Sequence, residues 1–212
     1  MAKRSVIIAG ATGLVGREIL GALLADDTVG EVHSLGRRAP AVQHPKLRVH
    51  LVDFANLPPL PHADEVYLAL GTTIKLAGSQ EAFRAIDYDA SLAAGRTALA
   101  AGAKKAGLVS AMGADSRSKV FYSRVKGELE DALTQMPFDG LVIARPSLLV
   151  GDREALGQPN RRGEEIGFAL GKILGSLIPA NYRPIAAKTV AHALLSAVPS
   201  AQGNKVLLSG SM

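Results

Sequence analysis

The chain has 212 residues, of which 48% are hydrophobic and 20% are charged, and its formal net charge is +5. This length and balance fit one globular domain and exclude a disordered tail, a coiled coil and a collagen-like fibre. The absence of cysteine excludes disulfides, Cys-ligated zinc, iron-sulfur clusters and thiol nucleophiles.

The N-terminus and the distribution of charge bear on location and partners. Residues 1–4 lead into an apolar run that is too short for a secretory signal and far below the roughly 20 residues of a membrane span. We therefore expect a cytoplasmic protein without a membrane partner. The pI of about 9.6 suggests nucleic acid, but the basic residues lie in scattered pairs and only 4% of residues are aromatic, so we expect no nucleic-acid partner.

Short apolar runs alternate with amphipathic segments, which is typical of βαβ units around a parallel sheet. Strands are expected at 5–9, 31–35, 47–52, 65–70, 107–110, 140–144 and 205–208. Helices are expected at 14–24, 81–103, 120–135, 164–174 and 189–197. The pattern predicts an α/β, doubly wound Rossmann fold with a mostly parallel sheet and helices on both faces.

The composition changes after the strand expected at 140–144, where a stretch rich in Gly, Pro and Arg reaches Gly163. Such a stretch is too small for a core of its own but long enough to close over a cleft at the strand ends. We expect residues 1–212 to form a single Rossmann domain, in which about 145–185 make a small cap over that cleft.

Three glycines follow the first expected strand and open the first helix. The first glycine permits a sharp turn, the second lets the backbone approach a pyrophosphate, and the third lets the helix pack closely on the strand. The helix N-terminus adds unpaired N–H donors and the positive end of the helix dipole. The segment therefore predicts a dinucleotide site in which the cofactor contacts Gly10, Thr12, Gly13, Leu14, Val15 and Gly16.

Further cofactor contacts are expected where the next strands end. The acid that holds the ribose 2′-hydroxyl of NAD is absent after 31–35, where Arg37 and Arg38 stand instead and suit a 2′-phosphate. We therefore expect NADP (NADPH) as the cofactor, with NAD less favoured. Asp53 and Phe54 are expected beside the adenine, although Asp in this place is also a common turn residue. Small and hydroxylated residues beside the cofactor follow the next strand, namely Leu70, Gly71, Thr72 and Thr73.

Tyr122 and Lys126 lie four positions apart, which puts both on one face of the helix expected at 120–135. A cationic neighbour favours a phenolate, so the pair suits proton exchange with a substrate oxygen. Ser110 ends the preceding strand and can donate a hydrogen bond to the same oxygen. These three residues are the predicted catalytic group. Glu130, four positions after Lys126, predicts a salt bridge with it on the helix surface.

The glycine loop, Ser110 and the Tyr122/Lys126 pair resemble the short-chain dehydrogenase/reductase superfamily, in its atypical, extended-like branch, over most of the chain. More narrowly, the segments 70–73, 77–84, 87–89, 126–130 and 145–146 with 151–153 are similar to the group of the Tat-interacting protein TIP-thirty, also called CC-three, and its bacterial relatives.

The resemblance also implies a role for each residue of the predicted catalytic group. It implies that Ser110 polarises a carbonyl, that Tyr122 is the acid or base, and that Lys126 holds the nicotinamide ribose. It adds Tyr122, Lys126, Arg145 and Pro146 to the cofactor site. Asp87 falls in the region where classical members carry a proton-relay Asn.

These features predict an NADP-dependent oxidoreductase that moves a hydride between the nicotinamide and a small carbonyl or alcohol. Two alternatives stay open, an NADPH-binding regulator with little or no catalysis and a nucleoside-sugar epimerase-like enzyme. The five histidines show no ligand spacing, so no metal is expected. The segment 90–103 and the Tyr122 helix could pack against a second copy of the chain, as in superfamily dimers.

Overall fold

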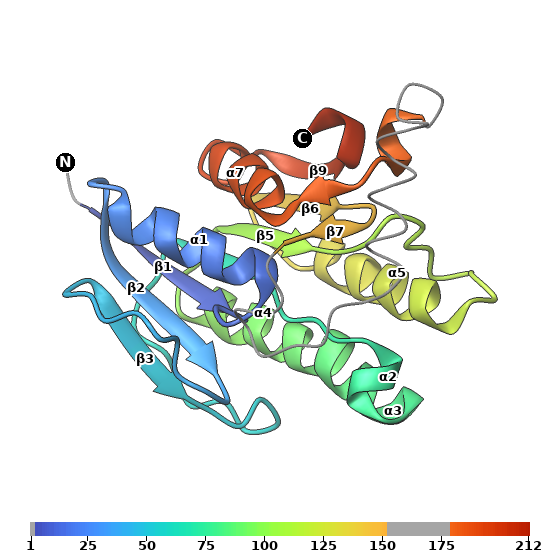
Figure 1. Ribbon diagram of the computed structural model, residues 1–212. Helices are drawn as coiled ribbons and strands as arrows, with labels where there is room; N and C mark the ends of the chain where they lie inside the picture. Colours follow the sequence, from blue (N-terminus) through green and yellow to red (C-terminus); the bar gives the residue numbers. More distant parts are fainter. Residues whose placement is uncertain (1–2, 152–178) are drawn as a thin grey trace.

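The computed structural model describes residues 3–151 and 179–212. In this part of the chain seven parallel strands form one sheet, in the order β3-β2-β1-β4-β5-β6-β9 (Figure 1). Their bounds are β1 (Arg4–Ala9), β2 (Val29–Gly36), β3 (Leu47–Leu51), β4 (Glu65–Leu68), β5 (Lys105–Val109), β6 (Gly140–Arg145) and β9 (Gly203–Leu208).

Helices cover both faces of this sheet (Figure 1). On one face, α1 (Leu14–Ala25) packs beside α7 (Ala187–Ala197), and their apolar sides join the strands in one hydrophobic core. On the other face, α4 (Ser91–Ala100) and α5 (Phe121–Thr134) close a second core. The predicted doubly wound α/β fold with helices on both faces is therefore confirmed.

The central strands read as continuous apolar runs because both of their faces are covered. Val6, Ile7 and Ile8 of β1 have no exposed surface, and every residue of β4 is buried. The edge strand β3 differs, since its Val49 and Leu51 side chains are 42% and 66% exposed. The core therefore sits along β1 and β4, in the middle of the sheet.

The strand order places a crevice beyond the carboxyl ends of the neighbouring strands β1 and β4. From β1 the chain winds outward through β2 and β3, then crosses back so that β4 pairs with the opposite side of β1. The connections that follow β1 and β4 therefore leave in opposite directions. Ligands of open α/β sheets bind beyond the carboxyl ends of the strands at such a switch point.

The connections hold short elements that apolar periodicity does not predict. The segment expected as one helix at 81–103 contains α3 (Gln80–Arg84), the π-helical η1 (Ala85–Ala90) and α4, and it is preceded by α2 (Ile74–Ala77). The two-residue strands β7 (Leu149–Val150) and β8 (Ile185–Ala186) pair with each other. Two 3₁₀ turns complete the described elements, η3 (Ala180–Tyr182) and η4 (Ser209–Ser211).

The cap expected at about 145–185 is described only at its two ends, where β7 and β8 lie. The helix expected at 164–174 lies outside the described residues. No helix within 3–151 or 179–212 has the length and hydropathy needed to cross a bilayer.

Candidate active site

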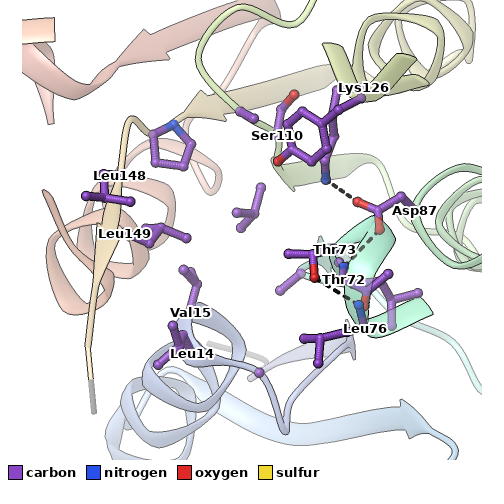
Figure 2. A pocket seen from close by; sticks show the side chains of 18 of the residues that line it. Leu14, Val15, Thr72, Thr73, Leu76, Asp87, Ser110, Lys126, Leu148 and Leu149 are labelled. Carbon is purple, nitrogen blue, oxygen red and sulfur yellow. Dashed lines mark hydrogen bonds and ion pairs between the residues drawn. The ribbon is translucent and has the colours of Figure 1, made fainter. Parts of the chain in front are cut away.

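A cavity of about 280 Å³ opens at the carboxyl edge of the sheet, where the connections after β1, β4, β5 and β6 meet. Figure 2 shows Ser110, Lys126 and Asp87 on one side of it and Leu14 and Val15 of α1 on the other. Its described lining includes eleven of the residues predicted for catalysis or cofactor binding, which are Gly13, Leu14, Val15, Leu70, Gly71, Thr72, Thr73, Ser110, Tyr122, Lys126 and Pro146.

The glycine loop forms the floor of this cavity between β1 and α1. Gly10 has φ +94°, and a Cβ there would lie 2.5 Å from the carbonyl of Ala69 after β4. A Cβ on Gly16 would lie 2.0 Å from the Gly10 oxygen. Both positions therefore require glycine, which brings α1 close to β1 and β4.

Gly13 differs from the other two glycines, because a Cβ there meets its nearest described atom, the Gly10 oxygen, at 3.4 Å. It stands at the N-cap of α1 in an extended conformation, and no side chain caps the helix. Gly13, Leu14 and Val15 line the cavity. The first turn of α1 therefore presents N–H groups and the positive end of its dipole to the cavity, an arrangement that suits a phosphate anion.

The loop after β4 forms the opposite wall and is held by two side-chain contacts. The Thr73 hydroxyl accepts a hydrogen bond from Leu76 N at 3.2 Å and so caps α2. Asp87 Oδ2 accepts one from Thr72 N at 2.9 Å (Figure 2). These contacts place an uncharged backbone strip, from Leu70 to Thr73, along the cavity.

Lys126 is buried in the wall of the cavity, where its charge is balanced by Asp87 from η1. Lys126 Nζ lies 2.7 Å from Asp87 Oδ1, and the two side chains are 6% and 0% exposed (Figure 2). Burial alone would lower the pKa of Lys126, but the charges of Asp87, Tyr122 and Glu130 and the contact with Asp87 raise it above 10.5 in sum. Lys126 is therefore an ammonium cation over the whole neutral range of pH.

Tyr122 lies in the first turn of α5, one helical turn before Lys126, and lines the cavity. Its ring packs against the buried Phe83, with the ring centroids 5.4 Å apart. Phe83 also packs edge-on against Phe121 at 5.9 Å. These aromatic contacts fix the start of α5 and thereby the position of the Tyr122 phenol.

Ser110 follows β5 and faces a buried carboxylate. Its hydroxyl donates a hydrogen bond to Glu130 Oε1, and Arg145 Nε donates to both oxygens of Glu130 at 3.1 Å. Ser110 and Glu130 are only 5% and 4% exposed. The predicted surface salt bridge between Lys126 and Glu130 is therefore wrong, since the two side chains point into the protein toward different partners, Asp87 and Arg145.

Some predicted cofactor residues lie outside the lining of the cavity. Arg37 and Arg38 follow β2 in exposed positions, and neither makes an ion pair with a described residue. Asp53 bonds its own turn, where Oδ1 accepts from Ala55 N at 3.0 Å, and Phe54 packs against the core beneath α4 and α5. Gly10, Thr12 and Gly16 shape the loop beneath the cavity, and Arg145 supports Glu130.

The sequence reasoning did not predict the contacts of two buried carboxylates, Asp87 with Lys126 and Glu130 with Arg145. The signal for Glu130 was its spacing of one helical turn from Lys126, together with Arg145 at the end of a strand. Within 3–151 and 179–212 no group of three or more His, Asp and Glu side chains converges in a way that could hold a metal ion.

Comparison with known proteins gives close relatives. No protein-family model matches the chain. The mitochondrial protein FMP52 of Emericella nidulans is 33% identical over 186 residues, which cover 82% of this chain and 78% of the relative. The mitochondrial FMP52 of Candida albicans is 35% identical over 172 residues, which cover 77% and 75%.

Similar solved structures share the fold at low sequence identity. The Bordetella bronchiseptica enzyme WbmH in complex with NAD⁺ has a TM-score of 0.73 at 16% identity, covering 99% of this chain and 77% of its own. A UDP-N-acetylglucosamine 4-epimerase from Methanobrevibacter ruminantium has a TM-score of 0.71 at 16% identity, covering 98% and 77%.

The relatives overturn one prediction. The expected cytoplasmic location is contradicted, because the FMP52 relatives are named as mitochondrial proteins. The prediction depended on the lack of a long apolar segment near the N-terminus, and that feature bears on secretion and membrane insertion rather than on mitochondria.

Proposed function

The chain belongs to the FMP52 family, and we propose that it is an NADP-dependent oxidoreductase that moves a hydride between a nicotinamide and a small carbonyl or alcohol. One observation carries the proposal. A single cavity joins the uncapped N-terminus of α1 to the Ser110, Tyr122 and Lys126 side chains. An anion site and a proton-exchange site therefore lie within the reach of one dinucleotide.

The residues present fit such a dinucleotide. Gly10 and Gly16 let the glycine loop pack closely against the segment after β4 and the start of α1, and the first turn of α1 offers unpaired N–H donors to a pyrophosphate. Lys126, charged and beside the cavity, suits the hydroxyls of a ribose. When bound, the nicotinamide would supply or accept the hydride.

The chain itself would handle the proton. In the direction of reduction, the Tyr122 phenol would give its proton to the carbonyl oxygen of the substrate. Solvent then returns a proton to Tyr122. Lys126 lines the cavity together with Tyr122 and would orient the reacting oxygen, whereas the Ser110 hydroxyl donates its proton to Glu130 and is left as an acceptor.

Arg37 and Arg38 favour NADP over NAD. They follow β2 directly beyond the point where Gly10 N donates to Leu35 O at 3.4 Å, so they stand beside the glycine loop. Their guanidinium groups are exposed and suit the 2′-phosphate that distinguishes NADP from NAD.

A second candidate is a nucleoside-sugar epimerase-like enzyme. It is favoured by the likeness of the fold to the sugar-nucleotide epimerase described above. An epimerase returns its hydride to the same substrate and consumes no NADPH overall, whereas a reductase consumes one NADPH for each carbonyl. The narrower resemblance to the TIP-thirty group stays a prediction and leaves room for an NADPH-binding regulator.

The test is NADPH consumption with a panel of small aldehydes, ketones and quinones, compared between wild type and Tyr122→Phe. We expect Tyr122→Phe to lower turnover by about 10²-fold or more while NADPH affinity stays within a factor of about two. Tyr88→Phe is the matched control, because Tyr88 stacks under Arg84 outside the cavity and keeps its ring in the variant. Full turnover by Tyr122→Phe contradicts the proposed role of the phenol.

A further inference from the structure

Asp87 and Lys126 form an ion pair that is almost fully withdrawn from water. The two charged groups are 2.7 Å apart, and neither side chain is more than 6% exposed. The second oxygen of Asp87 is held by Thr72 N at 2.9 Å, so the carboxylate is fixed from two sides (Figure 2). The pair therefore stays together as long as this wall of the cavity keeps its structure.

The ion pair between Asp87 and Lys126 changes the electrostatic field at Tyr122. A lone ammonium one helical turn away would favour the phenolate form of a tyrosine, because an opposite charge nearby stabilises the charged form. Asp87 adds a negative charge 2.7 Å from Lys126 Nζ. From Tyr122 the two charges then act as a dipole, whose field falls off faster with distance than that of a single charge. Burial leaves little water to screen either charge.

Among the described residues at the cavity, no second positively charged side chain replaces the charge of Lys126 that Asp87 offsets. Glu130 also faces Lys126, but its carboxylate is matched by Arg145. Phe83 contributes a neutral ring against Tyr122. The remaining described lining residues carry no charge, namely Gly13, Leu14, Val15, Ala69, Leu70, Gly71, Thr72, Thr73, Leu76, Val109, Ser110, Ala111, Pro146, Ser147, Leu148 and Leu149.

We propose that Asp87 is a positioning residue that cancels most of the field of Lys126 at Tyr122. This inference rests on the proposed oxidoreductase function and adds Asp87 to the residues that set the proton affinity of the Tyr122 phenol.

The ionisation of Tyr122 can be measured by ultraviolet absorbance, since the chain has four tyrosines and no tryptophan. Subtracting the titration of Tyr122→Phe from that of wild type isolates the Tyr122 transition. We expect Asp87→Asn, which leaves Lys126 as an unbalanced cation, to lower the pH midpoint of this transition by about 1 unit or more. A midpoint that does not fall overturns the proposal.

Asp89→Asn is the matched control. It makes the same chemical change two positions further along η1, at an exposed site where water screens the charge. We expect the Tyr122 midpoint of this variant to equal that of wild type. A shift as large as that of Asp87→Asn would mean that any loss of negative charge moves Tyr122, and would overturn the specific role of Asp87.

Asp87→Asn leaves a buried cation without its partner and can weaken folding. The double variant Asp87→Asn/Lys126→Met removes both charges and keeps this wall neutral, as it is in wild type. We expect its Tyr122 midpoint to match that of wild type. If the field of Lys126 reached Tyr122 uncancelled, removing it would raise the midpoint by about 1 unit or more, and that result also overturns the proposal.

These titrations need neither NADPH nor substrate. A protein that binds no dinucleotide, or turns over no carbonyl, would refute the proposed function and leave the measured midpoints unaffected. Conversely, an unmoved midpoint in Asp87→Asn would refute the role of Asp87 in an enzyme whose NADPH consumption is intact.

Discussion

The two walls of the cavity are built by different means. The wall at the ends of β1 and β4 consists of backbone, with glycines at Gly10, Gly13 and Gly16 and an uncapped helix N-terminus. The other wall depends on paired charges, with Asp87 of η1 against Lys126 of α5 in the lining and Glu130 against Arg145 outside it. The first wall depends on the space that missing side chains leave, and the second depends on the balance of charge.

This difference separates the two kinds of damage that substitutions can do. Added volume harms the backbone wall, because the atoms in its way belong to other backbone segments that cannot move aside. Removal of one partner harms the charged wall, because the other partner stays buried without compensation.

The largest effect is expected from Gly16→Ala in the backbone wall. Its new Cβ would lie 2.0 Å from the Gly10 oxygen and 2.7 Å from the Gly10 carbonyl carbon. We expect the free energy of unfolding in urea to fall by about 3 kcal/mol. Gly21→Ala on the same helix is the control, because nothing lies within 4 Å of its Cβ and alanine favours the helix. Equal stability of the two variants would contradict the close packing of α1 on the loop.

Glu130→Ala tests the charged wall, and we expect it to have the second-largest effect on stability. It leaves the guanidinium of Arg145 and the hydroxyl of Ser110 without their acceptor. Because the Arg145 side chain is still 29% exposed, we expect a loss of about 2 to 3 kcal/mol, at the lower end for a broken buried pair. The more exposed Glu128, which pairs with Arg84, is the control, and Glu128→Ala should cost less than about 1 kcal/mol. A loss for Glu128→Ala as large as for Glu130→Ala would show that burial does not separate the two pairs.

Gly13→Ala should leave folding intact and weaken cofactor binding. Its Cβ meets the Gly10 oxygen at 3.4 Å, so the backbone tolerates it, but the methyl is added where α1 faces the cavity. We expect NADPH affinity to fall about tenfold, or 1.4 kcal/mol, measured by the change in NADPH fluorescence. Gly21→Ala serves again as the control, with unchanged affinity. Undiminished binding by Gly13→Ala would mean that no phosphate approaches this turn.

The smallest expected effect is that of pH on the stability supplied by Lys126. Its pKa is raised above 10.5, so the contribution is complete below that value and is lost only as pH rises through the folded-state pKa. We expect the difference in free energy of unfolding between wild type and Asp87→Asn/Lys126→Met to stay constant from about pH 6 to pH 9. A difference that declines steadily over this range would mean that Lys126 loses its proton near neutrality.

The backbone wall was the predictable half of the site. The spacing of Gly10, Gly13 and Gly16 after an apolar strand has one physical explanation, and the buried strands β1, β4 and β6 read directly as apolar runs. The two-residue strands β7 and β8 are too short to show a period. The π-helical turn η1 leaves no pattern of its own in the side chains, so its placing of Asp87 against Lys126 was not foreseen.

The charged wall was not predictable for a different reason. Asp87, Ser110, Glu130 and Arg145 come from four separate elements, and a charged pair one helical turn apart is usually exposed. Only the register of β5 with β6 and the packing of α5 on them show that Glu130 is buried. The side chains that balance charge in the site therefore required the fold, whereas those that make room for a ligand did not.

The most direct test of the account is a fluorescence titration of the purified protein with NADPH and, in parallel, with NADH. The account predicts saturable binding of NADPH, weaker binding of NADH, and loss of this difference in Arg37→Ser/Arg38→Ser. Absence of saturable binding for both dinucleotides would contradict the assignment of the cavity to a nicotinamide cofactor.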